Sequence, residues 1–391
     1  MASELQVNTI TEATSGSGIT FAKDIIPATP LSHRNMIING GMKVAQRATS
    51  SGASSGYNNL DRFRWTGGGH ASMAGTIAQV AVTDLAGFSK CLKYTVTTEE
   101  SSISNNEYWW MHTKIEGQDL QCLSYGTSNA KTCTLSFYVR CSVAGTYAVS
   151  IMKPDSTSQQ FGGTYTVSST QASNSTAAAG WQRVSITIPA NTAQGIADDN
   201  GIGFDIYWVL FAGSDYTGTN NTSWVNTANG AYAYGHNTTM GTVDNSTWEI
   251  TGVQLELGSV ATPFEHRTYQ DEVRRCQRYY YKLISGANAA SSDYNDLYQN
   301  YLNIIWYSSV NARGLVTHPV TMRVNPSFSA NGNFQTITGT SLSSSDFSAG
   351  DYGGTPVYSV RVNKSGNTTY YGTTVRSNND ATAYFAWDAE L

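Results

Sequence analysis

Apolar and polar residues alternate along several stretches of the chain, which is the pattern of half-buried β-strands. In residues 131–142 one face carries only apolar side chains: Cys133, Leu135, Phe137, Val139 and Cys141. Three further stretches repeat the alternation: 146–152, 183–188 and 201–211. The sequence therefore predicts several strands in the middle of the chain, each with one face in a core.

Another predicted strand, residues 248–258, changes phase halfway along. Its apolar positions are even up to Ile250 and odd from Val253 onwards, and Gly252 lies at the change. An extra residue at such a point predicts a β-bulge. Because long polar loops rather than helical patterns separate the strands, we predict an antiparallel sandwich, a galactose-binding-like jelly roll, over residues 34–267.

The pattern changes at residues 268–277, where acidic residues precede basic ones. This order complements a helix dipole, so we predict a short linker helix, followed by a strand at 279–284. Residues 278–391 return to strand patterns and form a predicted second β domain. Near its end, the apolar stretches 369–375 and 381–387 flank a Ser-Asn-Asn-Asp turn, which predicts a hairpin.

Residues 1–33 differ from the rest because no apolar period is long enough to close a core. The segment holds short apolar pairs, a Ser-Gly-Ser-Gly hinge and two prolines. We predict an N-terminal docking arm that becomes ordered when another subunit covers it. Its docking side chains would be the apolar ones: Leu5, Val7, Ile10, Ile19, Phe21, Ile25 and Ile26.

Composition favours turn-rich β structure. Charged residues make up 13% of the chain, against roughly 25% in average proteins, while Gly, Tyr and Trp are abundant. A net charge of −5 without a basic stripe argues against nucleic-acid binding. No apolar run is long enough to span a membrane and no signal-peptide pattern is present, so we expect neither insertion nor secretion. We expect the five cysteines to be free thiols, mostly buried.

Three patches resemble a family of phage virion proteins, especially those of marine and cyanobacterial phages, known as tail fibres or carbohydrate-binding-like structural proteins. The patches are RNMIINGGM at 34–42 with QR at 46–47 and DRF at 61–63, TGVQLELG at 251–258 with ATPFE at 261–265, and CQRYY at 276–280 with PVTMR at 319–323 and NP at 325–326. The arm, with VNTI at 7–10 and SGIT at 17–20, resembles the start of such fibres.

This resemblance implies a jelly roll, a homotrimeric virion appendage and attachment to host-surface glycans. It implies no catalytic residues. The partners expected on this basis are further copies of the chain, other virion proteins of the tail or capsid, and a host glycan, and the expected location is the virion after synthesis in the host cytoplasm.

Sugar recognition needs aromatic faces that stack on apolar C–H faces, together with polar groups for the hydroxyls. Two clusters supply candidates for glycan binding: Tyr108, Trp109 and Trp110, and then Trp224, Tyr232, Tyr234 and His236 in a long polar loop. Burial in the core or at a subunit interface is the alternative for both clusters. If 108–110 is a strand, the adjacent tryptophans point to opposite faces, and one of them belongs to the core.

Polar residues elsewhere leave two interpretations open. Gln254 and Glu256 alternate with apolar neighbours, so they form either a floor for a sugar or an ordinary solvated sheet face. The asparagines and glycines of 34–42 suit a tight turn after a short apolar strand at 36–38.

The sequence carries no convincing catalytic or metal-binding motif. Residues 52–56 match G-x-S-x-G, but they lie in a Ser/Gly run and not in a strand–turn–helix context. The six histidines are scattered without zinc-site spacing, and Asp198–Gly201 lacks the rest of a calcium loop. We therefore expect no cofactor, no metal and no enzyme activity.

The leading hypothesis is a fibre-type virion protein that docks by its arm and contacts host glycans. A first alternative is a head fibre or capsid decoration protein. A second alternative is a polysaccharide depolymerase, which would need two carboxylates about 5 to 10 Å apart.

Overall fold

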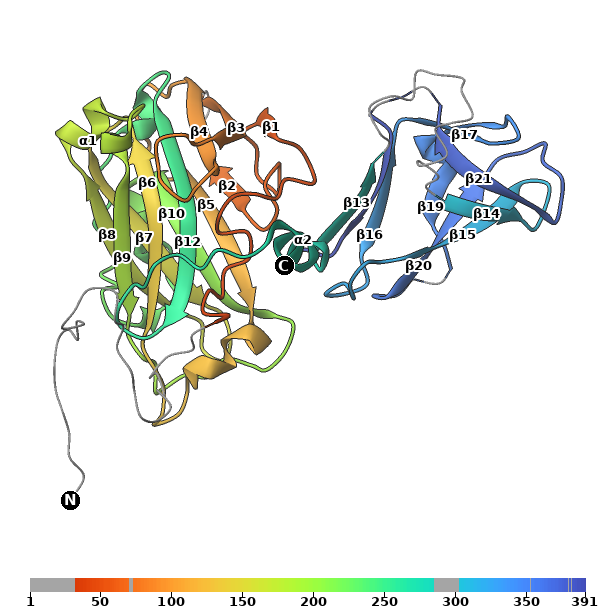
Figure 1. Cartoon of the computed structure of the whole chain (residues 1–391). Helices are drawn as coiled ribbons and strands as arrows, with labels where there is room; N and C mark the ends of the chain where they lie inside the picture. The colour runs from red at the N-terminus through yellow and green to blue at the C-terminus, as the bar shows by residue number, and fades with distance from the viewer. Residues whose placement is uncertain (1–31, 70–72, 285–301, 352, 379, 381) are drawn as a thin grey trace, which may run out of the picture.

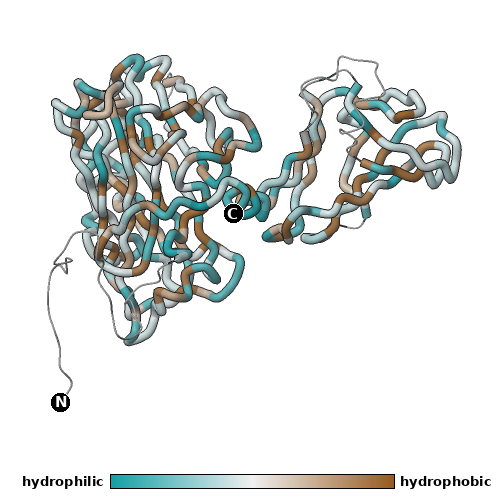
Figure 2. Tube along the Cα trace, in the orientation of Figure 1, coloured by the Kyte–Doolittle hydropathy of each residue, from teal (hydrophilic) through white to brown (hydrophobic). Residues whose placement is uncertain are grey.

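The computed structural model of the protein describes residues 32–69, 73–284, 302–351, 353–378, 380 and 382–391. Two β bodies are joined through helix α2, Tyr269–Gln277, and the strand that follows it (Figure 1). Hydrophobic residues gather along the strands of both bodies, and hydrophilic ones gather where α2 joins them (Figure 2). The predicted docking arm, including its seven apolar residues, lies outside the described residues.

The larger body is a sandwich of two six-stranded antiparallel sheets. Sheet A runs in the order β1 Ser50–Gly52, β3 Ala74–Ala81, β4 Lys90–Thr98, β12 Thr247–Leu257, β6 Cys133–Cys141 and β9 Gln182–Ile188. Sheet B runs in the order β11 Val225–Asn226, β8 Gln159–Val167, β7 Gly145–Lys153, β10 Ile202–Ala212, β5 Tyr108–Glu116 and β2 Arg64–Gly68. The prediction of an all-β jelly-roll sandwich followed by a second β domain is confirmed.

Short helical turns lie in the connections between strands. They are α1 Ser169–Ser173, η1 Gly117–Leu123, η2 Ala178–Gly180, η3 Ser214–Tyr216, η4 Asn229–Ala231, η5 Met240–Thr242 and, in the second body, η7 Ser344–Asp346. Helix α1 begins with a capping box in which the Ser168 hydroxyl accepts the Gln171 N–H and the Gln171 side chain reaches back.

The sandwich core fills the space between the two sheets. The five apolar residues of β6 are all fully buried there, and Phe137 meets Trp208 of β10 edge-on, with ring centroids 5.8 Å apart. The predicted bulge is also confirmed, because the register of β12 against β6 shifts between Thr251 and Gln254, and Gly252 has a φ of +62°. All five cysteines are free thiols, and Cys122 alone among them is exposed.

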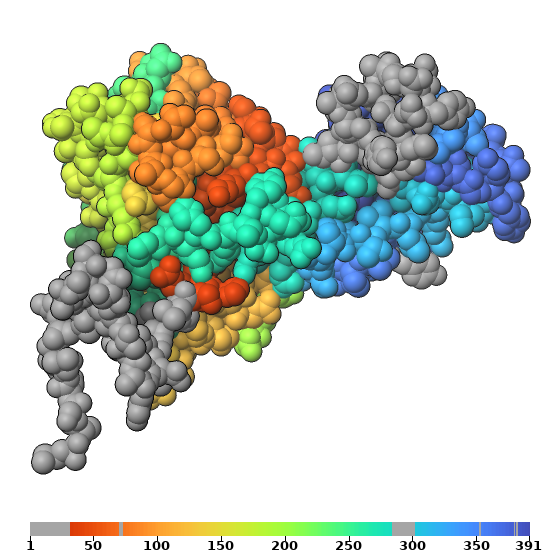
Figure 3. All heavy atoms as spheres, viewed as in Figure 1, coloured from red at the N-terminus to blue at the C-terminus, as the bar shows by residue number. Residues whose placement is uncertain are grey.

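The outer face of sheet A is covered, which corrects both interpretations of Gln254 and Glu256. These side chains are 0% and 2% exposed. Glu256 accepts hydrogen bonds from the Thr262 N–H at 2.8 Å and the Thr262 hydroxyl at 2.6 Å, while Gln254 accepts the Glu265 N–H at 2.8 Å. The segment after β12 folds back over the sheet (teal in Figure 3), so the alternating polar residues form a buried network and not a sugar floor.

Residues 34–42 pack beside the same sheet and turn sharply. The tight turn is confirmed by the Met42 N–H, which donates to the Asn39 carbonyl at 2.9 Å, and by the positive φ of Asn39. The predicted strand at 36–38 is wrong. Of residues 36–38, all within the described part of the chain, Met36 alone has a backbone hydrogen bond to β12, from its N–H to the Leu255 carbonyl, because the turn at Asn39 redirects the backbone before a ladder can form.

Helix α2 occupies the position of the predicted linker helix, with Thr268 as its N-cap. The second body beyond it contains two antiparallel sheets. Sheet C has the order β13 Tyr280–Ile284, β22 Tyr384–Asp388 and β16 Ser327–Asn331. Sheet D has the order β18 Ser341–Ser343, β17 Asn333–Thr336, β21 Tyr371–Ser377, β14 Leu302–Trp306, β15 Asn311–Thr317, β20 Val357–Asn363 and β19 Phe347–Ala349.

The hairpin predicted between the last two strands is wrong. Strand β21 pairs with β14 and β17 in sheet D, whereas β22 pairs with β13 and β16 in sheet C. Strand β22 is apolar on both faces, with Phe385, Ala386 and Trp387 all buried. In sheet C both edges of β22 are paired, and Phe385 and Trp387 lie in the core of the second body, so this packing overrides the local turn signal.

The chain end returns to the sandwich and joins the two bodies through buried charges. The guanidinium of Arg62 pairs with Glu390 and lies 3.4 Å from the ring centroid of Tyr279. Arg278 donates two hydrogen bonds of 2.7 Å to the buried carboxylate of Glu116. Burial alone would raise the pKa of Glu116, but these bonds and one from the Tyr279 hydroxyl outweigh it and lower that pKa. The junction therefore holds ionised groups in a matched network.

Candidate functional site

The adjacent residues Trp109 and Trp110 on β5 point to opposite faces of sheet B. Trp109 is 2% exposed and lies in the sandwich core, where it stacks on Trp65 with ring centroids 5.6 Å apart. Trp110 lies on the outer face, in a separate cluster of apolar and aromatic side chains. One of the pair belongs to the core, as predicted, and that residue is Trp109.

Rings from β5, β10 and the loop 213–243 meet on this outer face and form what we call the aromatic cluster: Tyr108, Trp110, Tyr207, Tyr216 and Tyr232. Trp110 is its centre, stacked on Tyr108 at 4.1 Å and on Tyr232 at 5.1 Å between centroids. Trp110 itself is 5% exposed, whereas Tyr108, Tyr216 and Tyr232 are half-buried. Three tyrosine rings thus form a rim that keeps part of its surface open to solvent.

The loop 213–243 is fixed to the sheet by His236. The Ala148 N–H donates to His236 Nδ1 at 3.3 Å, and the imidazole packs edge-on against Tyr147. His236 is buried, which argues against the sugar contact predicted for it. It instead holds in place the loop that carries Tyr216 and Tyr232.

Acidification is expected to weaken this attachment. Burial lowers the pKa of His236 to about 3, whereas an unfolded histidine titrates near about 6.5. The folded state thus favours the neutral ring, and the resulting stability is complete above pH 6.5 or so and is lost as the pH falls toward about 3. Between about pH 7 and pH 5 the free energy of unfolding should fall by roughly 2 kcal/mol through this residue.

Urea denaturation at these two pH values measures the effect. In His236→Phe, which cannot be protonated, the expected drop in unfolding free energy is smaller than in the wild type by the same amount. The exposed His33, changed to Gln, is the matched control and should retain the wild-type pH dependence. Identical pH dependence in His236→Phe and the wild type would contradict the assignment.

A row of polar side chains lies next to the aromatic cluster on the outer face of sheet B. His112 Nδ1 lies 2.7 Å from Asp205, and the imidazole stacks on Tyr207 with centroids 4.7 Å apart. Because the Asp205 carboxylate accepts, Nδ1 is assigned the proton and Nε2 accepts from the Thr66 hydroxyl at 3.0 Å. Arg64 donates to Thr66 at 3.2 Å and remains half-buried.

The arrangement joins an apolar ring surface to fixed polar groups. A tyrosine rim suits the C–H face of a pyranose, and the half-buried Arg64 and Thr66 at its border suit hydroxyl groups. His112 and Asp205 are each 2% exposed, so they lie below the surface and hold the Thr66 side chain in place through the hydrogen bond to His112.

The structure brings together only part of the predicted glycan-binding set. Tyr108 and Trp110 from the first cluster meet Tyr232 from the second. Trp224 packs against the sandwich core and donates its indole N–H to the Pro189 carbonyl at 2.9 Å, because its strand end lies over Phe204. Within the described part of the chain, Tyr234 is half-buried and forms no ring contact with the cluster.

Two members of the aromatic cluster were missed at the level of sequence. Tyr207 occupies the opposite phase to the core residues of β10, so the alternation itself could have marked it as an outer-face ring. Tyr216 lies in a polar loop and has no sequence signal that separates it from other loop tyrosines.

Among the described residues, no three His, Cys, Asp or Glu side chains are grouped so as to hold a metal ion. No helix in the described part of the chain is long and apolar enough to cross a membrane.

Comparison with known proteins gives distant structural similarities. No protein-family model matches the sequence, and no curated protein matches it. The enzymatically active domain of bacteriophage CBA120 tailspike protein 4 is similar at 8% identity and a TM-score of 0.29, over 57% of this chain and 21% of that one. TmCBM61 in complex with β-1,4-galactotriose is similar at 9% identity and a TM-score of 0.26, over 57% of this chain and 99% of that one.

The tandem CBM22-1–CBM22-2 domains of Paenibacillus barcinonensis Xyn10C give 9% identity and a TM-score of 0.26, over 92% of this chain and 98% of that one. Similarity at this level assigns neither a ligand nor an activity to the present chain.

Proposed function

We propose that this protein is a fibre-type structural protein of a phage particle that binds host-surface glycans through the outer face of sheet B. The observation that carries the proposal is the rim of Tyr108, Tyr216 and Tyr232 around Trp110, next to Arg64 and Thr66. Half-buried tyrosines combine ring faces with hydroxyl groups, which is the combination that a pyranose requires.

Adhesion by this route depends on copy number. A single shallow, half-exposed rim offers few contacts, so each sugar is held weakly. In a homotrimer docked by the N-terminal arm, several rims act together, and linked sites gain roughly 10²–10⁴ in avidity. We therefore place the protein on the virion as a multivalent adhesin, whose partners are its own copies, other virion proteins and the glycan.

Removing one tyrosine of the rim is expected to weaken glycan binding. Tyr108→Ala and Tyr232→Ala should each weaken the monovalent affinity by about two- to tenfold, because a stacked ring contributes roughly 0.5–1.5 kcal/mol. A glycan array probed with wild-type protein identifies the ligand, and calorimetry with that ligand measures the loss. Tyr370, which is 85% exposed in the second body, provides the matched control as Tyr370→Ala. Unchanged affinity in both rim variants would refute this site.

Binding without hydrolysis is part of the proposal. Thr66, His112 and Asp205 are ordered like the hydroxyl, imidazole and carboxylate of an acyl-transfer triad. In such a triad the imidazole must hand its proton to the leaving group of the substrate, and His112, which is 2% exposed, is shielded from a ligand on the outer face. Incubation with the bound polysaccharide should release neither reducing ends nor acyl groups, and release of either would favour the depolymerase or esterase alternative.

The remaining alternative is a head fibre or decoration protein that mainly stabilises the capsid. Particles assembled without this protein distinguish the two roles. We expect them to remain intact but to adsorb poorly to the host, whereas fragile particles with normal adsorption would favour the decoration role. An electron-microscopy map of the particle shows where this protein lies. Comparing that map with one of particles carrying a chain that lacks residues 1–29 tests docking by the arm.

A further inference from the structure

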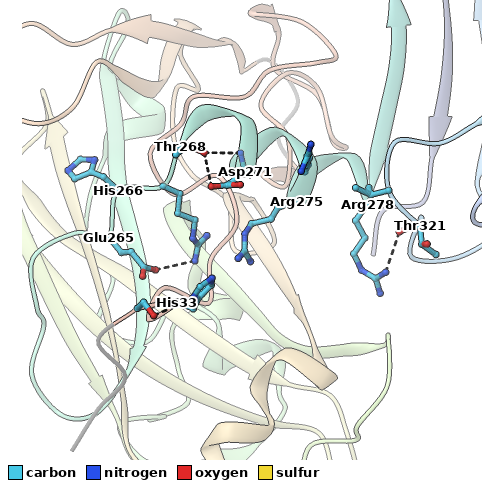
Figure 4. A pocket seen from close by; sticks show the side chains of 12 residues that line it. His33, Glu265, His266, Thr268, Asp271, Arg275, Arg278 and Thr321 are labelled. Carbon is cyan, nitrogen blue, oxygen red and sulfur yellow. Dashed lines mark hydrogen bonds and ion pairs between the residues drawn. The ribbon is translucent and has the colours of Figure 1, made fainter. Parts of the chain in front are cut away.

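A polar groove lies beside helix α2, where the helix leads into the second body (Figure 4). Its volume is about 600 Å³. The lining is almost entirely polar: Ser32, His33, Glu265, His266, Arg267, Thr268, Asp271, Arg274, Arg275, Arg278, Val320 and Thr321. Four arginines within twelve residues line one groove of a chain whose net charge is −5, so this is a local concentration of positive charge.

Two of the four arginines already have partners in the fold. Arg267 pairs with Glu265 at 3.4 Å and with Glu272 at 3.6 Å, and Arg278 pairs with Glu116 at 2.7 Å. The remaining acid of the lining, Asp271, accepts the Thr268 hydroxyl at 2.6 Å at the start of α2. Glu265 is therefore balanced by Arg267 within the groove, while Asp271 is held at the start of α2 by Thr268 and keeps its charge.

Arg274 and Arg275 form no ion pair or hydrogen bond with any described residue. Arg274 is exposed and Arg275 is half-buried. Figure 4 shows Arg275 extending from the helix toward the side of the groove where His33 and Glu265 lie, while Arg278 reaches toward Thr321. Two guanidinium groups without an ion pair among the described residues are thus available to a ligand in the groove.

The charges next to Arg267 bear on what the groove would accept. Burial is the main cause that lowers the pKa of Arg267, and the charge of Arg275 lowers it further, against the opposing effect of Glu272. Like charges this close raise the free energy of the unliganded groove, and an anion between them would relieve that repulsion. Guanidinium groups match planar oxyanions by forming paired, charge-assisted hydrogen bonds.

We propose that this groove binds an acidic saccharide, with carboxylate or sulfate groups of the sugar held by Arg274 and by Arg275. A saccharide fits better than an acidic protein segment, because the lining contains one aliphatic side chain, Val320, and no aromatic anchor. Protein interfaces rely on such anchors for most of their binding energy. In an acidic sugar, charge-assisted hydrogen bonds to the carboxylate or sulfate replace the ring stacking on which a neutral pyranose depends. This inference does not depend on the tyrosine rim of sheet B.

Polygalacturonate and its fully methyl-esterified form test the proposal, since they share the same sugar backbone and differ in charge. In affinity electrophoresis, polygalacturonate in the gel should slow the migration of the full-length protein, whereas the methyl-esterified polymer should not. Arg274→Gln/Arg275→Gln should weaken polygalacturonate binding at least tenfold. Lys131→Gln/Lys364→Gln removes the same charge away from the groove and should bind as the wild type does.

Three results would overturn the proposal. One is equal affinity in Arg274→Gln/Arg275→Gln and the wild type, and another is equal affinity for the esterified polymer. Poly-glutamate bound as tightly as polygalacturonate would point to an acidic protein segment instead. Tyr108→Ala separates the two sites, because it should retain polygalacturonate binding even if the function proposed for the rim is wrong. Thermal unfolding of each variant checks that the fold is intact.

Discussion

Replacing Arg62 by methionine is expected to lower the free energy of unfolding by about 3–5 kcal/mol, the usual cost of breaking a buried ion pair by removing one partner. Arg62 is 1% exposed, and the side chain of Glu390 is 4% exposed. Besides this pair, Arg62 donates to the Lys114 carbonyl at 2.6 Å and covers the ring of Tyr279. Methionine would fill much of the volume but would leave Glu390 with Arg47 alone, at 3.4 Å.

The same substitution should loosen the junction between the two bodies. Arg62 belongs to the sandwich, Tyr279 follows α2 and Glu390 is the penultimate residue, so one side chain holds three distant segments. We expect limited proteolysis to separate the bodies faster in Arg62→Met than in the wild type. The exposed Arg183, changed to Met, provides the matched control for loss of an arginine.

A double variant tests the physical cause. In Arg62→Met/Glu390→Met both charges are removed, so no buried carboxylate lacks its partner, and the loss of stability should be smaller than in Arg62→Met alone. Chemical denaturation of the wild type, Arg62→Met, Glu390→Met and the double variant completes this double-mutant cycle. If Arg62→Met lies within about 1 kcal/mol of the wild type, the junction does not depend on this ion pair.

The second large effect is expected at Gly40, where alanine should destabilise the fold by about 1–3 kcal/mol or more. A Cβ at this position would lie 2.0 Å from the carbonyl oxygen of Val253. That oxygen cannot easily move, because the Asn35 side chain donates to it at 3.0 Å and the Val253 N–H bonds back to Gly40 at 2.9 Å. The clash therefore falls on the bulged backbone of β12.

Gly41 provides an internal control for this prediction. A Cβ at Gly41 would meet the ring of Phe264 at 3.7 Å, an ordinary contact, so Gly41→Ala should be neutral or slightly stabilising. Thermal and urea unfolding of the two neighbouring variants should thus differ clearly. Similar stability in both would show that residues 34–42 do not dock on β12 as closely as the structure indicates.

Local sequence patterns were sufficient to predict most strands and the linker helix. In β6 and β10 the apolar residues recur at every second position, and the period of the side chains dictates which face enters the core. Helix α2 was predictable from its charge order and its threonine cap. The hairpin of β21 and β22 was not, because the choice of strand partner depends on distant segments that also need to be covered.

The candidate site was predictable only in fragments. Adjacent Trp109 and Trp110 revealed one outward ring, and the polar loop revealed Tyr232, but their stacking requires the loop 213–243 to fold back over sheet B. His236 illustrates the limit, since a loop histidine among polar neighbours gives no sign that it will be buried. The groove at α2 was not predictable either. Glu265, Glu272 and Glu116 pair with Arg267 and Arg278 in the folded chain, and only these pairings show that Arg274 and Arg275 have no ion-pair partner among the described residues.

The sequence by itself determined the β architecture, the bulge at Gly252 and the linker helix, because these follow from the spacing of neighbouring residues. Its composition also determined the abundance of aromatic and polar side chains. Tertiary structure alone decided which polar faces are buried, which rings meet and which charges lack a partner. Burial and pairing depend on segments hundreds of residues apart, such as Arg62 and Glu390, and no local pattern encodes the covering segment.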